Sequence, residues 1–167
     1  MTLHDLNTLQ KEKQLEVLLS CCGSERWARC VAGKLPAEDL VDLLENAEEC
    51  WLSCSQDDWK EAFASHPEIG NMESLGKKYS NTASWSAEEQ SGTGSASQQT
   101  LQALADANRL YREKFGYIFI VCATGKSAEE MLGSLHARLG NSHSAEISIA
   151  ADEQWRITKL RLEKLLE

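Results

Sequence analysis

Residues 144–167 read SAEISIAADEQWRITKLRLEKLLE, and this stretch decides the class of fold. At 100° per residue its apolar side chains fall on one arc, as expected for an amphipathic helix that packs against a core. The arc contains Ile147, Ala150, Ala151, Leu162 and Leu165, and it is bounded by Trp155 and Ile157. The sequence therefore predicts a helix from Ser144 to the C-terminus with one buried face.

Three polar residues lie inside that apolar arc. Gln154, Thr158 and Arg161 recur at i, i+4 and i+7, so they form a polar strip on the inward face. A buried guanidinium needs an anion, because an unpaired buried charge costs several kcal/mol. A core carboxylate and a bound anionic ligand both meet this need, and the pattern alone somewhat favours the carboxylate.

The rest of the chain also shows helical periodicity. Helices are expected at residues 2–21, 24–33, 36–51, from Ser55 or Asp57 to His66, 98–115 and 127–139. In this reading Ser24 is an N-cap, Pro36 occupies the first position of a helix, and Ser127 with Glu130 forms a capping box. Residues 80–97 are rich in Ser, Thr and Gly and are expected to form a loop.

The apolar run Tyr117–Ala123 is ambiguous. Its aromatic and β-branched residues favour a strand, but no second convincing strand exists to satisfy its hydrogen bonds. We therefore expect a buried, mostly helical segment and an all-α fold, with residues 1–167 forming a single domain of about seven to nine helices.

Composition excludes several classes of partner. The formal charge is −9, with 26 acidic and 17 basic residues and no basic run, which argues against binding to nucleic acid or an anionic membrane. No apolar run approaches the roughly 20 residues of a membrane span. We expect a cytoplasmic protein whose six cysteines are reduced and pack in the interior.

Two short motifs are candidates for chemistry. In HPEIG (66–70), proline disfavours helical backbone at His66, so a helix should end there and present an imidazole that titrates near neutral pH. In SAEEQSG (86–92), Ser86 and Glu89 satisfy a capping box, and a helix N-terminus can cradle an anionic or amide-rich ring. His4, His136 and His143 lack such context and are expected at the surface.

These motifs, followed by FGYIFIVCA (115–123) and Arg161-Leu162, resemble the OHCU decarboxylase family in content, order and spacing. OHCU is 2-oxo-4-hydroxy-4-carboxy-5-ureidoimidazoline, an intermediate of urate breakdown. The resemblance extends from about Leu6 to Leu166. It implies an all-α homodimer that decarboxylates this small molecule to (S)-allantoin and CO2 without a cofactor or a metal.

The resemblance also assigns site residues. It implies that His66, Glu89 and Arg161 are catalytic. The residues implied to bind substrate are Pro67, Ser86, Ala87, Glu88, Gln90, Ile118, Phe119, Ile120, Val121 and Cys122. Residues 118–122 are expected to hydrogen-bond the substrate through their backbone groups. These groups should converge on one cavity with room for a hydantoin-sized ring.

Two other classes remain open on the sequence alone. A non-catalytic helical binding module would explain the amphipathic helices and the five tryptophans, but it would not require the inward polar strip. A metal-dependent hydrolase of a cyclic amide would need ligands at usable spacing, and the chain offers no such signature.

Overall fold

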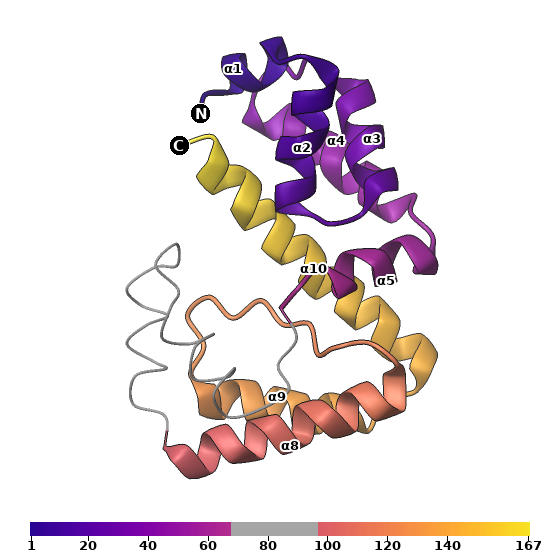
Figure 1. Cartoon of the computed structure of the whole chain (residues 1–167), viewed down its shortest axis with the longest axis vertical. Helices are drawn as coiled ribbons and strands as arrows, with labels where there is room; N and C mark the ends of the chain where they lie inside the picture. The colour runs from indigo at the N-terminus through magenta and orange to yellow at the C-terminus, as the bar shows by residue number, and fades with distance from the viewer. Residues whose placement is uncertain (68–96) are drawn as a thin grey trace. The chain divides into compact units, whose positions relative to one another are not determined.

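The computed structural model describes residues 1–67 and 97–167, and the regular structure in these two ranges is entirely α-helical (Figure 1). The helices are α1 (Leu3–Thr8), α2 (Lys11–Cys21), α3 (Glu25–Lys34), α4 (Leu40–Leu52), α5 (Gln56–Ala64), α8 (Gln98–Phe115), α9 (Ala128–Leu139) and α10 (His143–Leu165). The all-α prediction is confirmed. Among the described helices, none combines the length and the hydrophobicity that crossing a membrane would need.

The chain divides into two compact units, one formed by Met1–His66 with Ala151–Glu167 and the other by Pro67–Ala150. Helix α10 contributes to both, because the division falls within it. The expectation of a single domain therefore stays a prediction. The loop predicted at 80–97 lies almost wholly outside the described residues.

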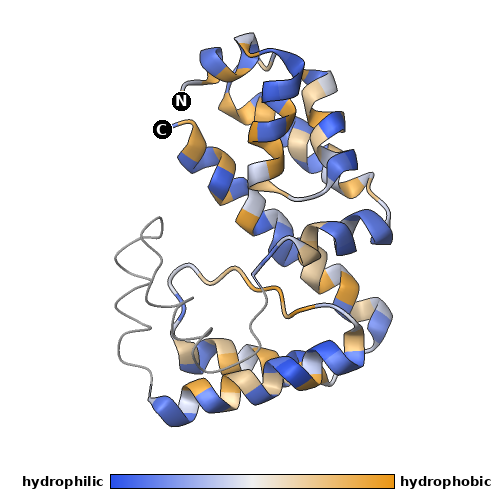
Figure 2. Cartoon of the chain, in the orientation of Figure 1, coloured by the Kyte–Doolittle hydropathy of each residue, from blue (hydrophilic) through white to orange (hydrophobic). Residues whose placement is uncertain are grey.

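The helices of the first unit carry both hydrophobic and hydrophilic residues (Figure 2), and their apolar side chains form its core. Its fully buried side chains include Leu6, Leu18, Trp27, Leu43, Phe63 and Leu162. Two buried indoles also donate hydrogen bonds. Trp27 Nε1 donates to the carbonyl of Ala47 at 2.9 Å, and Trp51 Nε1 donates to that of Ala151 at 3.0 Å. These bonds link α3 to α4 and α4 to α10.

The predicted helix over residues 2–21 is in fact two helices, so this prediction was wrong in its continuity. The backbone is extended at Leu9 and Gln10. The buried Gln14 side chain donates to the carbonyl of Leu6 at 3.0 Å, and this bond satisfies a helix-end acceptor that the break would otherwise leave unpaired. The Asn7 amide donates to and accepts from the backbone of Ala37, at 2.9 and 3.0 Å.

The start of α4 also differs from the prediction. Pro36 lies before the helix, after a cis peptide bond from Leu35, and the helix begins at Leu40. Asp39 is the N-cap, and its Oδ1 accepts from the Asp42 N–H at 2.8 Å. A capping carboxylate at this position outweighs the preference of proline for the first helical turn. Leu40, the first residue of the helix, is 37% exposed.

The predicted serine N-caps and the glycine end of α8 are confirmed, whereas α3 continues one residue beyond Gly33 and only the Ser127 half of the predicted capping box with Glu130 is formed. Ser24, Ser55 and Ser127 are N-caps whose hydroxyls accept from backbone N–H groups of the first turn. Helix α8 ends at Gly116, whose φ of +83° is the left-handed conformation that glycine adopts without steric cost.

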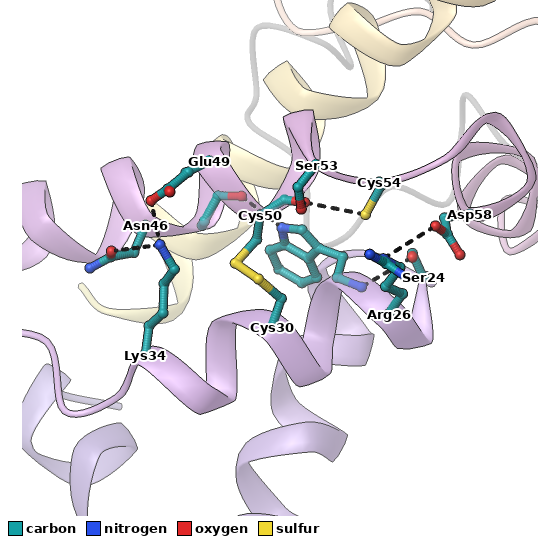
Figure 3. Close-up of a disulfide and its surroundings, with 12 residues drawn as sticks. Ser24, Arg26, Cys30, Lys34, Asn46, Glu49, Cys50, Ser53, Cys54 and Asp58 are labelled. Atoms are coloured by element: carbon teal, nitrogen blue, oxygen red, sulfur yellow. Dashed lines mark hydrogen bonds and ion pairs between the residues drawn. A yellow bond between two sulfur atoms is a disulfide. The ribbon is translucent and has the colours of Figure 1, made fainter.

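The expectation that all six cysteines are reduced is wrong for one pair. Cys30 on α3 and Cys50 on α4 form a disulfide with their Cα atoms 5.8 Å apart (Figure 3). Lys34 forms an ion pair with Glu49 across the same two helices. A spacing of 20 residues carries no pairing signal, whereas the packing of α3 on α4 brings the two thiols together. The other four cysteines are thiols.

The second unit packs α8, α9 and the first part of α10 around an aromatic cluster. Its core contains Leu104, Ala107, Tyr111, Phe115, Phe119, Ala128, Met131 and Leu135. The segment Tyr117–Ala123 adopts no helix, so the prediction of a mostly helical segment is wrong. Gly116 ends α8, and the next residues run as an irregular connection to α9. Phe119 and Ile120 are buried, and the rest of this segment is half-buried.

Candidate functional site

His66 lies at the exit of α5, as predicted. The helix begins with a capping box between Ser55 and Asp58 and ends at Ala64. The His66 backbone N–H donates to the carbonyl of Phe63 at 3.2 Å, which completes the final turn. Pro67 follows and is exposed, so the chain leaves the helix directly after the imidazole. The side chain of His66 is half-buried.

The imidazole contacts the polar strip of α10. His66 Nε2 lies 2.6 Å from Gln154 Oε1. Gln154 Nε2 donates to Thr158 Oγ1 at 3.2 Å, and that hydroxyl donates to the Gln154 carbonyl at 2.9 Å. Gln154 is 0% exposed and Thr158 is 1% exposed. Gln154 and Thr158 therefore point inward as predicted, and they link His66 to the buried face of α10.

Arg161, the third member of the strip, is half-buried and has a different partner from the one expected. Its Nη1 donates to the carbonyl of Cys21 at 3.2 Å. Within residues 1–67 and 97–167, no carboxylate lies within ion-pair distance of it. Cys21 is the last residue of α2, where the helix dipole places partial negative charge. Burial raises the pKa of the Cys21 thiol, and the nearby Arg161 charge opposes this shift.

The backbone of residues 118–122 is anchored by a buried cation. Arg138 Nη1 donates to the carbonyl of Ile120 at 2.7 Å. The same guanidinium lies over the Phe119 ring, 4.4 Å from its centroid. Arg138 is 7% exposed. Its contacts therefore fix both the path of the main chain and the ring of this predicted substrate-binding segment.

Glu146 neutralises Arg138 in the interior of the second unit. Its Oε1 accepts from Arg138 Nε at 2.7 Å and from the Tyr111 hydroxyl at 2.6 Å, and its Oε2 accepts from Asn141 at 2.9 Å. Arg138 Nη2 also lies 2.7 Å from Oε1, but only the Nε contact has the geometry of a hydrogen bond. Burial, and then the bond to Glu146, raises the pKa of Tyr111 well above its usual range.

The sequence motifs do not identify Arg138 and Glu146 as members of the site. Arg138 occurs in a helix rich in charged residues, and its periodicity does not distinguish it from a surface position. The available signal was position, because Glu146 lies on the buried side of the final helix near Ile147 and Ala150. The hydrogen-bonded ion pair with Arg138, eight residues earlier, explains why the Glu146 carboxylate can be buried at this position.

The remaining predicted site residues are only partly placed. Ser86, Ala87, Glu88, Glu89 and Gln90 lie outside the described residues. His66 and Arg161 belong to the first unit, and residues 118–122 belong to the second. Convergence of His66, Glu89 and Arg161 on one cavity therefore stays a prediction. In the described part of the chain, no group of three or more His, Cys, Asp or Glu side chains could hold a metal ion.

Comparison with known proteins gives consistent matches. The model of the family described as OHCU decarboxylase matches residues 7–163. The uric acid degradation bifunctional protein TTL of Arabidopsis thaliana is 41% identical over 149 residues, which are 87% of this chain and 45% of that protein. A 2-oxo-4-hydroxy-4-carboxy-5-ureidoimidazoline decarboxylase of Halalkalicoccus jeotgali is 27% identical, with 99% of this chain and 92% of that protein covered.

A solved structure agrees with these matches. An OHCU decarboxylase crystallised in the presence of (S)-allantoin superposes with a TM-score of 0.75 at 34% identity, covering 95% of this chain and 99% of that one. The chain spans about half the length of the Arabidopsis relative, which is a bifunctional protein. The family match covers nearly all of the present sequence. The chain belongs to the OHCU decarboxylase family.

Proposed function

We propose that this chain decarboxylates 2-oxo-4-hydroxy-4-carboxy-5-ureidoimidazoline to (S)-allantoin and CO2 without a cofactor, as a step of urate degradation. The observation that supports this most strongly is the family match over residues 7–163. The local geometry is compatible with it, because a half-buried histidine at a helix exit is hydrogen-bonded to a buried polar strip.

The chemistry requires little from the protein beyond positioning. Decarboxylation leaves the electron pair of the broken C–C bond on the substrate, and many enzymes supply a cofactor to accept it. Here the substrate carries a C=N bond next to the carbon that loses CO2, so its own ring can hold the charge. The protein then has to orient the anion and deliver one proton to one face of the ring.

His66 is the proposed proton donor. Histidine is the side chain whose unperturbed pKa allows it to give and recover a proton near neutral pH. Its place at the end of α5 fixes the backbone, and the bond to Gln154 restricts the ring. Delivery from one fixed imidazole to one face would make the product a single enantiomer.

Arg161 is the proposed anchor for the substrate anion. Arg161 donates a hydrogen bond to the neutral carbonyl of Cys21. This bond does not neutralise the guanidinium charge, and no carboxylate in residues 1–67 and 97–167 does so. Glu89 is proposed to hold ring and hydroxyl hydrogens, with Pro67, Ser86, Ala87, Glu88 and Gln90 contributing further contacts. The backbone of Ile118 to Cys122 is proposed to hydrogen-bond the ureido and ring amides. Arg138 supports this role, because it holds the Ile120 carbonyl in place.

We further propose that the protein acts as a homodimer in the cytoplasm, on this small molecule and not on nucleic acid. The net charge of −9 supports the exclusion of nucleic acid. Analytical ultracentrifugation would test the assembly, and a sedimentation coefficient of a monomer at micromolar concentration would remove the dimer from the proposal.

The kinetic test compares two histidine variants. The substrate is generated from urate with the two upstream enzymes, and its decay is followed by ultraviolet absorbance. A positioned general acid contributes about 10²- to 10⁴-fold, so His66→Ala should lose that factor in kcat. His136→Ala, at an exposed position on α9, is the matched control and should retain the wild-type rate. Equal turnover by both variants would remove His66 from the mechanism.

A further inference from the structure

The hydrogen bonds around Gln154 determine which nitrogen of His66 carries a proton. The Thr158 hydroxyl donates to the Gln154 carbonyl at 2.9 Å, so its oxygen is left to accept from the Gln154 side chain. The group that lies 3.2 Å from that oxygen must then be the amide NH2. The carboxamide oxygen therefore faces His66. Reversing the amide would require Thr158 to give up its backbone bond.

An amide oxygen only accepts hydrogen bonds, so the His66 Nε2 atom 2.6 Å away must carry the hydrogen. This excludes the neutral tautomer protonated at Nδ1. It leaves two states, the neutral ring protonated at Nε2 and the imidazolium protonated at both nitrogens. Because Gln154 is 0% exposed and Thr158 is 1% exposed, water does not compete for these groups.

We infer that Gln154 is a positioning residue that holds His66 in the Nε2–H form, so that Nδ1 is the nitrogen that exchanges the proton with substrate. Thr158 in turn fixes the orientation of the Gln154 amide. The role in turnover rests on the proposed decarboxylation, whereas the protonation pattern rests on the hydrogen bonds alone.

The proton transfer balances as follows. The electron pair released with CO2 moves into the adjacent C=N bond, which leaves a C=C bond between the hydroxyl-bearing and ureido-bearing carbons and negative charge on the ring nitrogen. The imidazolium gives its Nδ1 proton to the ureido-bearing carbon, whose new C–H bond takes the electron pair of that C=C bond. The hydroxyl hydrogen passes to the ring nitrogen, and the carbon that lost CO2 becomes a carbonyl carbon of allantoin. The ring of His66 returns to the neutral Nε2–H tautomer without losing its bond to Gln154. Solvent then restores the Nδ1 proton for the next turnover.

The first test is spectroscopic and independent of activity. In protein labelled with ¹⁵N at histidine, long-range ¹H–¹⁵N correlation spectra at a pH where the ring is neutral distinguish the two tautomers. His66 is assigned by the signal that disappears in His66→Gln. We expect a protonated Nε2 and an unprotonated Nδ1. A wild-type ring protonated at Nδ1, or an even mixture of the two forms, would overturn the inference.

The second test uses substitutions of Gln154. Gln154→Met keeps the length of the side chain but removes the acceptor, so the ring should sample both tautomers and kcat should fall by about 10- to 100-fold with a smaller change in KM. Gln154→Glu keeps an acceptor at the same place and should retain the Nε2–H form. Retention of a pure Nε2–H form and of wild-type kcat by Gln154→Met would contradict the assignment.

The outcomes separate this inference from the proposed function. A protein that shows the expected tautomer but leaves the ureidoimidazoline to decay unassisted would refute the activity and leave the hydrogen-bond assignment intact. A protein that decarboxylates rapidly with the opposite tautomer would refute the role of Gln154 and leave the activity intact.

Discussion

The sharpest stability prediction concerns Arg138. Replacing it with methionine keeps an unbranched side chain but removes the charge, the bond to the Ile120 carbonyl and the contact with Phe119. Glu146, which is 0% exposed, would keep its bonds from Tyr111 and Asn141 but lose its countercharge. Removing one partner of a buried ion pair costs about 3–5 kcal/mol, because the other charge remains desolvated.

This magnitude is large enough to measure by two methods. Urea unfolding should show a loss of about 3–5 kcal/mol, and the melting temperature should fall by roughly 6–20 °C for a chain of this length. The matched control is Arg29→Met, which breaks the ion pair with Glu25 at a site where the two side chains are 64% and 59% exposed. An exposed helical pair contributes only about 0.3–0.5 kcal/mol.

A double-mutant cycle tests the physical reason. Arg138→Met with Glu146→Gln removes both charges, so the double variant should be more stable than the sum of the two single losses predicts, by about 0.5–3 kcal/mol. If Arg138→Met loses no more stability than Arg29→Met, or if the two single losses are simply additive, then the buried pair does not hold the second unit together.

Three further predictions follow from the first unit. Loop-closure entropy over a separation of 20 residues predicts that reduction of Cys30–Cys50 lowers the free energy of unfolding by about 3 kcal/mol, whereas the same reductant should not affect a Cys30→Ala/Cys50→Ala variant. Burial raises the pKa of Cys22 from 9.0 to about 11, so the folded state keeps a proton that the unfolded chain has lost. The contribution of the Cys22 thiol to the free energy of unfolding should be full below pH 9 and should fall by up to about 1.4 kcal/mol per pH unit towards pH 11. Urea titrations of wild type and Cys22→Ala measure this contribution as their difference in stability. A difference that does not change with pH would contradict the prediction. Arg161→Met should raise KM by about 10- to 150-fold, the equivalent of one charged hydrogen bond, and an unchanged KM in steady-state assays would show that the guanidinium does not hold the substrate.

The helices could be predicted from the sequence where local signals agree. Ser24, Ser55 and Ser127 cap their helices and Gly116 ends one, because capping depends on residues within one turn. The inward strip of α10 was also predictable, since a helical period places Gln154 and Thr158 on the same face as the apolar residues.

The errors arose where contacts distant in sequence decide the structure. The break after α1 depends on the side chain of Gln14, and the irregular path of residues 117–123 depends on Arg138. The disulfide depends on the packing of α3 against α4. None of these partners is recognisable from periodicity, because each acts through a specific tertiary contact. The partner of Arg161 illustrates the same limit, since a helix-end carbonyl occupies the place expected for a carboxylate.

Circular dichroism of the product tests directly whether the chain catalyses the decarboxylation. Substrate prepared freshly from urate is mixed with the wild-type chain, and the ellipticity of allantoin is recorded during the reaction and at its end. If the chain is a decarboxylase, the ellipticity should rise rapidly to the full signal of the S enantiomer, with CO2 released in equal amount. Slow formation of racemic allantoin, at the same rate with and without the protein, would contradict this activity and would favour a helical binding module that performs no chemistry.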